Sequence, residues 1–176
     1  MKQKGKSNLI VVLVSINFFF SYCSIAQSAK ITVQGGGSVY FIINSLNKYN
    51  DGLTLDSWTK LKLTLDDPGL SGWQLTVRAG SATIQSEGEA PDLDLSTIEL
   101  RAEVVSTNDP TISNISPIVL SDNPSGDIIL SGSKVDDLEV VINIDYDCGT
   151  KPENKLLGKE ADFYFIDLYF QLSSVL

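Results

Sequence analysis

The sequence contains no histidine among its 176 residues. Histidine is the most frequent general base near neutral pH and the commonest metal ligand in proteins. Its absence excludes Ser-His-Asp and Cys-His catalysis and every zinc site built on imidazole. A glycosidase works with two carboxylates, so this enzyme class stays open. We predict a non-catalytic protein with no catalytic residue, no bound metal and no cofactor.

Cysteine is nearly as scarce, with Cys23 and Cys148 as its two occurrences. Cys23 lies within an N-terminal leader described below, so the exported chain keeps Cys148 alone. A single cysteine cannot form an internal disulfide. Cys148 is therefore predicted to be a small buried hydrophobe, with a free thiol as the alternative.

The first 26 residues have the three parts of a secretory signal peptide. Lys2, Lys4 and Lys6 supply the positive start, and an apolar run extends over 9–22. Small residues at Ser24 and Ala26 then complete a cleavage site, which predicts a mature chain of residues 27–176. The apolar run is too short to remain as a membrane anchor, so no transmembrane segment is expected after cleavage. We expect a secreted protein, extracellular or at the cell surface, with the periplasm as an alternative.

Positive charge is also in short supply. The leader holds three of the 13 basic residues, which leaves 10 basic against 22 acidic residues and a net charge of −12. Such a surface repels nucleic acid and anionic lipid, so we predict no nucleic-acid partner.

The mature chain alternates apolar and polar residues with a period of two, which is typical of half-buried strands. Clusters of Asp, Asn, Pro and Gly between these stretches favour turns. The pattern predicts an all-β domain over 27–176, a single antiparallel β-sandwich that is Ig-like in the broad sense, with about 8–10 strands. We expect strands at 31–34, 38–44, 60–65, 73–79, 82–85, 98–104, 118–121, 127–130, 138–147 and 162–173.

A Trp-x-Leu tripeptide occurs in mid-domain, at Trp73 to Leu75. Near the C-terminus the related tripeptide runs from Phe170 to Leu172, with Phe in place of Trp. This pair resembles the two Trp-x-Leu motifs of WxL-type bacterial surface domains. The resemblance implies a strand-rich domain at the cell surface that attaches non-covalently to a Gram-positive cell wall.

The two tryptophans have different expected positions. Trp73 shares the apolar parity of Leu75 and Val77, so we predict that it fills the core of the sandwich. Trp58 shares the parity of Lys60 and faces outward, where its ring is a candidate ligand-binding residue for a glycan or a partner. The alternative is a bulge that turns Trp58 inward.

The last expected strand, 162–173, is apolar on both faces. One face is the predicted core set of Tyr164, Ile166, Leu168, Phe170 and Leu172. The other face carries Phe163, Phe165 and Tyr169, which we predict to form an assembly interface. Such a strand is either central in its sheet with both faces covered, or an edge that another chain covers.

Four pairs of aspartates fall in turns or on outer faces, and none has the spacing of an EF-hand or of a nonapeptide repeat. We expect solvated turn carboxylates, with calcium binding as the alternative. The pairs are Asp66 and Asp67, Asp92 and Asp94, Asp136 and Asp137, and Asp145 and Asp147.

Taken together, these features of the sequence predict a secreted structural or adhesion protein that acts through a protein partner or self-assembly. The alternative is a glycan- or cell-wall-binding module.

Overall fold

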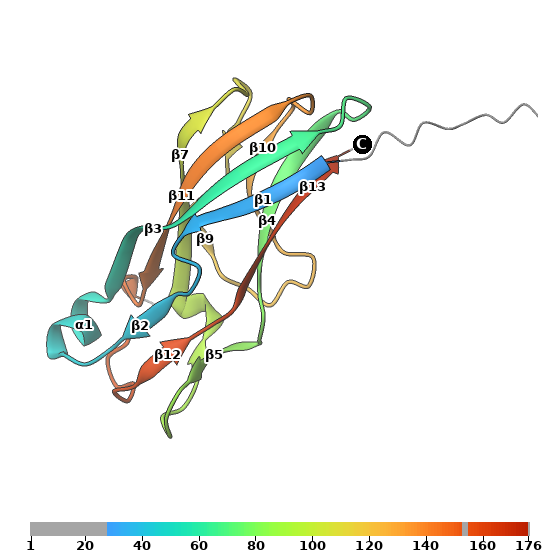
Figure 1. Ribbon diagram of the computed structural model, residues 1–176. Coiled ribbons are helices and arrows are strands. Elements are labelled where there is room, and N and C mark those ends of the chain that lie inside the picture. The colour runs from blue at the N-terminus through green and yellow to red at the C-terminus, as the bar shows by residue number, and fades with distance from the viewer. Residues whose placement is uncertain (1–27, 153–154, 176) are drawn as a thin grey trace, which may run out of the picture.

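The computed structural model describes residues 28–152 and 155–175, and this part of the chain folds as three antiparallel sheets (Figure 1). The predicted leader, its cleavage site and Cys23 lie outside the described residues. The largest sheet has five strands in the order β1-β3-β11-β7-β9. Its strands are β1 (Ser28–Gly35), β3 (Leu53–Asp66), β11 (Leu138–Cys148), β7 (Ile98–Thr107) and β9 (Ile118–Val119).

A four-stranded sheet forms the second layer, in the order β13-β4-β10-β8. Figure 1 shows its long strands on the other side of the molecule from β3, β11 and β7. One cluster of buried side chains from both sheets makes up the core. The strands are β13 (Leu168–Val175), β4 (Gly72–Ala79), β10 (Asp127–Gly132) and β8 (Ser113–Asn114).

The third sheet, here called the end sheet, lies at the lower end of the sandwich in Figure 1. It arises because the β4–β13 ribbon continues past a break, so that β4 leads into β5 and β12 leads into β13. Ala79 pairs with Leu168 and Gln85 with Phe165, so the longer insertion lies on the β4–β5 side. The order is β2 (Tyr40–Ile42), β12 (Phe163–Phe165), β5 (Thr83–Ser86) and β6 (Leu93–Asp94).

Two short helical segments complete the described chain. Helix α1 (Leu46–Asp51) follows β2, and its first turn is capped by Ser45, whose hydroxyl accepts from the Lys48 N–H. A 3₁₀ turn, η1 (Leu95–Thr97), precedes β7. In the part of the chain that the structure describes, the helices are too short and too polar to span a lipid bilayer.

Side-chain alternation places the core as predicted. Leu61, Leu63 and Leu65 of β3 are buried, as are Val140, Ile142 and Ile144 of β11, which pair with β3. Trp73 is also buried, so its predicted core position is confirmed. Cys148 is buried at the end of β11, and burial raises the pKa of its thiol to about 12. It is the small buried hydrophobe that the sequence predicts.

The all-β sandwich prediction is confirmed, with two differences in detail. The described residues form thirteen strands instead of eight to ten, partly because the two-residue strands β6 and β8 were not expected. The single strand predicted over 162–173 was wrong. The chain breaks between Phe165 and Leu168, where the Asp167 carbonyl accepts from the Gly80 N–H, and the two halves belong to different sheets.

Candidate functional site

An exposed apolar surface covers the outer side of β2 and β12 in the end sheet. Phe163 pairs with Ile42 and Phe165 with Tyr40, so the four side chains project from the same face. Tyr40 is 56% exposed and Phe163 is 50% exposed, while Phe165 is half-buried. We call Tyr40, Ile42, Phe163 and Phe165 the aromatic end face. These four side chains form a hydrophobic patch that faces solvent.

The opposite side of the same two strands is packed into the molecule. Phe41 and Tyr164 are completely buried, and the Tyr164 hydroxyl donates to the Glu160 carbonyl at 2.8 Å. Both strands are therefore apolar on their two faces, with one face covered. β12 is central in the end sheet, but one of its faces is exposed, so it is not the central strand with both faces covered that the sequence offered as one alternative. β13 is an edge strand, and its cover by another chain stays a prediction.

Two carboxylates accept hydrogen bonds from β5, Asp162 from the side of β12 and Asp92 from the segment before β6. Asp162 accepts from the hydroxyl of Ser86 and from the N–H of Phe163 and of Gly88, and these bonds, led by that of Ser86, lower the pKa of Asp162. Asp92 accepts from the Thr83 hydroxyl at 2.7 Å, which is the main cause of its lowered pKa. The two aspartates thus act as ionised hydrogen-bond acceptors that stabilise β5, the strand next to β12 in the end sheet.

A pocket of about 380 Å³ opens beside the aromatic end face, between the β1–β2 connection and the start of β13. Tyr40 and Phe165 reach into it from the end face, and Asp167 and Tyr169 line it from the strand break. The ring of Tyr169 is 51% exposed and lies under the guanidinium of Arg78, which is 4.8 Å from the ring centroid. The pocket therefore combines aromatic rings with one exposed carboxylate.

Trp58 lies next to this pocket and faces outward, as predicted. A register shift does occur between β3 and β11 at this point, yet Trp58 remains 42% exposed and is not turned inward. Its indole N–H donates to the Ser38 carbonyl at 2.8 Å, and the Thr59 hydroxyl donates to the Gly36 carbonyl at 2.6 Å. These two bonds fasten the Gly-rich connection between β1 and β2. Ligand binding by Trp58 stays a prediction.

The four residues singled out from the sequence thus surround one region. Phe165 and Tyr169 line the pocket, Phe163 extends the same face along β12, and Trp58 bonds to Ser38 on the pocket wall. Sequence reasoning missed Tyr40 and Ile42, which complete the face. The signal was present, because the buried residues Val39, Phe41 and Ile43 alternate with these two apolar residues in the same way as in the C-terminal segment.

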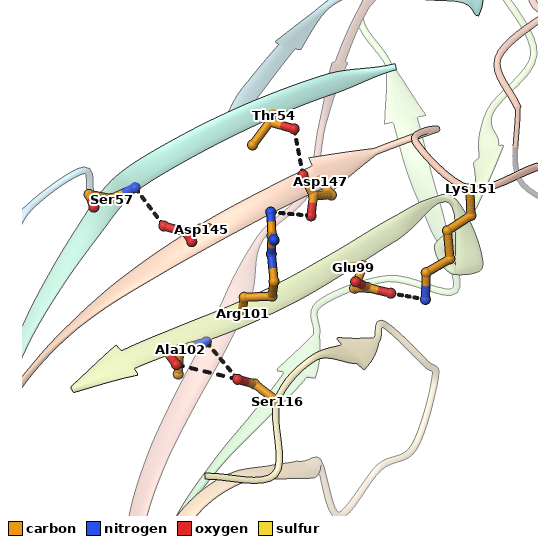
Figure 2. Close-up of polar contacts among 9 residues, drawn as sticks. All are labelled: Thr54, Ser57, Glu99, Arg101, Ala102, Ser116, Asp145, Asp147 and Lys151. Atoms are coloured by element: carbon orange, nitrogen blue, oxygen red, sulfur yellow. Dashed lines mark hydrogen bonds and ion pairs between the residues drawn. The ribbon is translucent and has the colours of Figure 1, made fainter. Parts of the chain in front are cut away.

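Asp145 and Asp147, on the outer side of β11, form contacts with neighbouring strands, as Figure 2 shows. Asp147 forms an ion pair with Arg101 at 2.7 Å and accepts from the Thr54 hydroxyl at 2.5 Å. Asp145 accepts from the Ser57 N–H at 2.6 Å. These contacts join β3, β11 and β7 on their solvent side, so both carboxylates have a structural role.

The remaining aspartate pairs lie at strand ends and in loops, and Asp67 is buried, unlike the solvated turn carboxylate that the sequence predicts. Asp94 caps η1 by accepting from the Ser96 N–H at 2.8 Å, and Asp67 follows β3 in a turn that bonds to Val135. Among residues 28–152 and 155–175, no group of three or more Asp, Glu or Cys side chains gathers in a way that could hold a metal ion.

The two tripeptides that resemble the WxL pattern lie on neighbouring strands. β4 and β13 pair in antiparallel register, with Leu75 opposite Leu172 and Val77 opposite Phe170. Trp73 faces Ser174 in this register. Phe170 and Leu172 are half-buried against the core, as the predicted core parity of this segment requires.

Neither a scan against protein-family models nor a search of curated proteins finds a match to this chain. A function is therefore inferred from the chemistry of this chain itself. The relevant regions are the aromatic end face, the pocket beside it and the edge of β13.

Proposed function

We propose that this chain is an exported, non-catalytic β-sandwich that acts at the cell surface or outside the cell by contact with another protein chain. The aromatic end face is its contact surface. The observation that carries this proposal is the cross-strand pairing of Tyr40 with Phe165 and of Ile42 with Phe163 on a solvent-facing sheet. Aromatic residues of this kind are the anchors of protein interfaces.

The energetic scale agrees with a contact role. A half-exposed aromatic side chain that loses about 100 Å² of accessible area gains about 2.5 kcal/mol on binding. Tyr40 and Phe163 would then contribute about 5 kcal/mol, and the less exposed Phe165 up to about 2 kcal/mol more, which is comparable to the cost of association. The aromatic end face would therefore offset about the free-energy cost of association, and a stable complex would need further contacts.

The carboxylates support a non-catalytic role. A glycosidase needs one carboxyl group with a raised pKa that can donate a proton. The hydrogen bonds to Asp92 and Asp162, next to the aromatic end face, lower the pKa of both groups instead. Asp167 lines the pocket without a second carboxylate beside it in the lining.

Export is part of the same proposal and rests on the leader over residues 1–26. N-terminal sequencing of the protein recovered from its producing cells should find Gln27 as the first residue. A chain that keeps Lys2 to Lys6, and remains in the cytoplasm, would contradict export.

Site-specific photocrosslinking tests the contact surface. A photoreactive phenylalanine analogue at Phe163, in the full chain expressed in its native host, should give one adduct of defined mass on illumination. The matched control carries the analogue at Val105, an exposed apolar residue at the end of β7. Mass spectrometry then tells whether the adduct contains a second copy or another protein. If Phe163 gives no more adduct than Val105, the aromatic end face is not a contact surface.

Glycan or cell-wall binding is the second candidate, and the pocket favours it. Tyr40 and Tyr169 offer ring faces on which a sugar can stack, and the Asp167 carboxylate can accept from sugar hydroxyls. Trp58 stands beside the same pocket. Binding to a glycan array and to insoluble peptidoglycan should then fall at least tenfold in Tyr169→Ala and in Trp58→Ala. Equal binding by both variants and the parent would exclude the pocket as a sugar site.

A further inference from the structure

The two long sheet edges of this fold differ in how they are protected. β1 and β13 each have eight residues, while the other edge strands in the described chain have two or three. β1 carries Lys30 and a register shift next to Gly35, both of which discourage pairing with another strand. β13 carries no charged residue, no proline and no glycine, and it pairs with β4 without a shift. β13 therefore lacks these protections, although β1 lies close to its C-terminal end.

The hydrogen bonds identify which backbone groups of β13 point outward. The carbonyls of Asp167, Gln171 and Val175 accept from Gly80, Thr76 and Ser71 on the β4 side. In an antiparallel pair, both backbone groups of a residue point to the same side, and the sides alternate along the strand. The N–H and C=O groups of the even-numbered residues therefore point to the free edge, where β13 has no strand partner in the described chain. These residues are Leu168, Phe170, Leu172 and Ser174.

The side chains at this edge are also incompletely covered. Leu168, Phe170 and Leu172 point toward the core but are only half-buried. Figure 1 shows β1 and β13 close together near the C-terminus of β13 and further apart toward its start. The pocket lined by Leu168 and Phe170 occupies this wider part. The first half of β13 thus offers both unpaired backbone groups and apolar surface.

We propose that β13 pairs with β13 of a second copy of this chain, antiparallel and about a two-fold axis, to join two four-stranded sheets into one of eight strands. This rests on the proposed function in one respect, namely that the chain works by contact with another chain. Centring the pair on Phe170 places Leu168 opposite Leu172 of the partner subunit and Tyr169 opposite the partner's Gln171. The outward backbone groups then meet each other in a regular antiparallel ladder.

Charge explains why a second copy is the occupant. The mature chain has a net charge of −12, so most surfaces of two copies repel each other. β13 is uncharged from Leu168 to Val175, and self-pairing sets no like charges directly opposite each other. Pairing of β1 with itself would instead place a Lys30 from each copy within the same eight-residue contact. Two-fold contacts of one surface with itself are also the commonest form of oligomer.

A charge-exchange experiment on the chain starting at Gln27 tests this pairing. One variant carries Tyr169→Lys and Gln171→Lys, and a second carries Tyr169→Glu and Gln171→Glu. Each alone sets like charges across the two-fold axis, and we expect the dimer dissociation constant, measured by sedimentation, to rise about tenfold. A 1:1 mixture of the two variants sets opposite charges across the axis and should recover the affinity of the parent.

The matched control makes the same charge changes on the protected edge, at Thr32 and Gln34 of β1, which are exposed. The dimer dissociation constants of these variants should stay within about twofold of that of the parent. Comparing the Lys variant with the Glu variant shows how much the change in net charge alone affects the dissociation constant. Circular dichroism must show that every variant is folded. If a double variant does not fold, the single changes Gln171→Lys and Gln171→Glu are used in the same mixing scheme.

Hydrogen exchange provides a second measurement that is specific to the edge. The amide of Phe170 should exchange more slowly as the protein concentration rises, while the amide of Thr32 on the other edge should not change. A parent that stays monomeric at millimolar concentration overturns the pairing, as does a dimer insensitive to the β13 variants. A dimer lost in Phe163→Ser but kept in the β13 variants would overturn the pairing while supporting the aromatic end face. Failure of the crosslink at Phe163 would count against the end face alone.

Discussion

The indole N–H of Trp73 donates to the carboxylate of Asp109 at 2.9 Å, and both side chains are buried. Asp109 also accepts from the backbone and the hydroxyl of Thr111, and from the Lys134 N–H. Gly132 packs so closely on this pair that a Cβ atom there would lie 2.2 Å from the Asp109 carboxylate. One tryptophan on β4 thus fills the core and ties two loops to it.

Truncation of Trp73 should therefore remove both packing and a hydrogen bond. We expect Trp73→Ala to lower the free energy of unfolding by about 3–5 kcal/mol, as for other buried aromatic residues. Trp73→Phe keeps much of the packing and should cost about 1.5–3 kcal/mol, mainly from the lost bond to a charged acceptor. Urea unfolding of both variants measures the two terms. A Trp73→Ala variant as stable as the parent would show that this residue is not structural.

Asp109 should also make stability depend on pH in the acid range. Burial alone would raise the pKa of Asp109, but the hydrogen bonds from Thr111, Trp73 and Lys134 outweigh it and lower the pKa below its usual value. The stabilisation is therefore complete above the unfolded pKa of about 3.9 and is lost as the pH falls through the folded pKa. Unfolding curves between pH 6 and pH 2 should show this loss, and Asp109→Asn should show a smaller one. An acid slope unchanged in Asp109→Asn would contradict the assignment.

The sandwich could be predicted from the sequence because its core obeys a local rule. In β3, β4 and β11, alternate residues face the interior, so the buried sets around Leu63, Leu75 and Ile142 could be recognised from their period of two. Trp73 follows the same parity. Trp58 could be placed on the outer face for the same reason, although its bond to Ser38 could not be foreseen.

The end sheet could not be predicted because it depends on contacts between distant segments. The parity of 162–173 runs unbroken through Ile166 and Asp167, so nothing local marks the point where one strand becomes two. The break coincides with the hydrogen bond from the Gly80 N–H to the Asp167 carbonyl, and Gly80 directly follows β4, far earlier in the chain. The aromatic end face was half predicted, since Phe163 and Phe165 were identified but their partners on β2 were not.

Gly36 should be the least replaceable residue of the β1–β2 connection. It has a φ of +63°, and a Cβ atom at this position would lie 1.9 Å from the carbonyl oxygen of Trp58. Gly36→Ala must therefore displace the backbone of β3, and we expect a loss of more than about 2 kcal/mol in the free energy of unfolding. Gly37 is the matched control, because nothing lies within 4 Å of its Cβ position. Thermal unfolding should separate the two variants clearly, and equal midpoints would contradict the close packing.

Cys148 should be unreactive as long as the chain is folded. Burial raises the pKa of its thiol to about 12, so almost no thiolate is present at pH 8, and the side chain is inaccessible. In the chain starting at Gln27, Cys148 is the single thiol, which makes the measurement direct. A thiol reagent at pH 8 should label the native protein slowly and the urea-unfolded protein at once. Rapid labelling of the native protein would indicate that this end of β11 opens readily.

Phe163 and Tyr164 are neighbours in the chain with opposite roles, and paired variants should separate them. Phe163 is 50% exposed and Tyr164 is fully buried. Phe163→Ser should change the free energy of unfolding of the isolated chain by no more than about 0.5 kcal/mol, since it removes little from the core. Tyr164→Ala should cost about 3–5 kcal/mol through its lost packing and its lost bond to the Glu160 carbonyl.

The effect on partner binding should be large for Phe163, the residue whose substitution has little effect on stability. If the aromatic end face is a contact surface, Phe163→Ser weakens partner binding while the fold is retained, and the crosslinked adduct formed from a probe at Phe165 falls with it. Phe165 lies on the same face but is half-buried, so Phe165→Ser should show an intermediate loss of stability together with the loss of binding. Urea unfolding at low protein concentration gives the stability of each variant without a contribution from association. A Phe163→Ser variant that unfolds far more easily than the parent would mean that the chain itself covers this residue, contrary to its exposure.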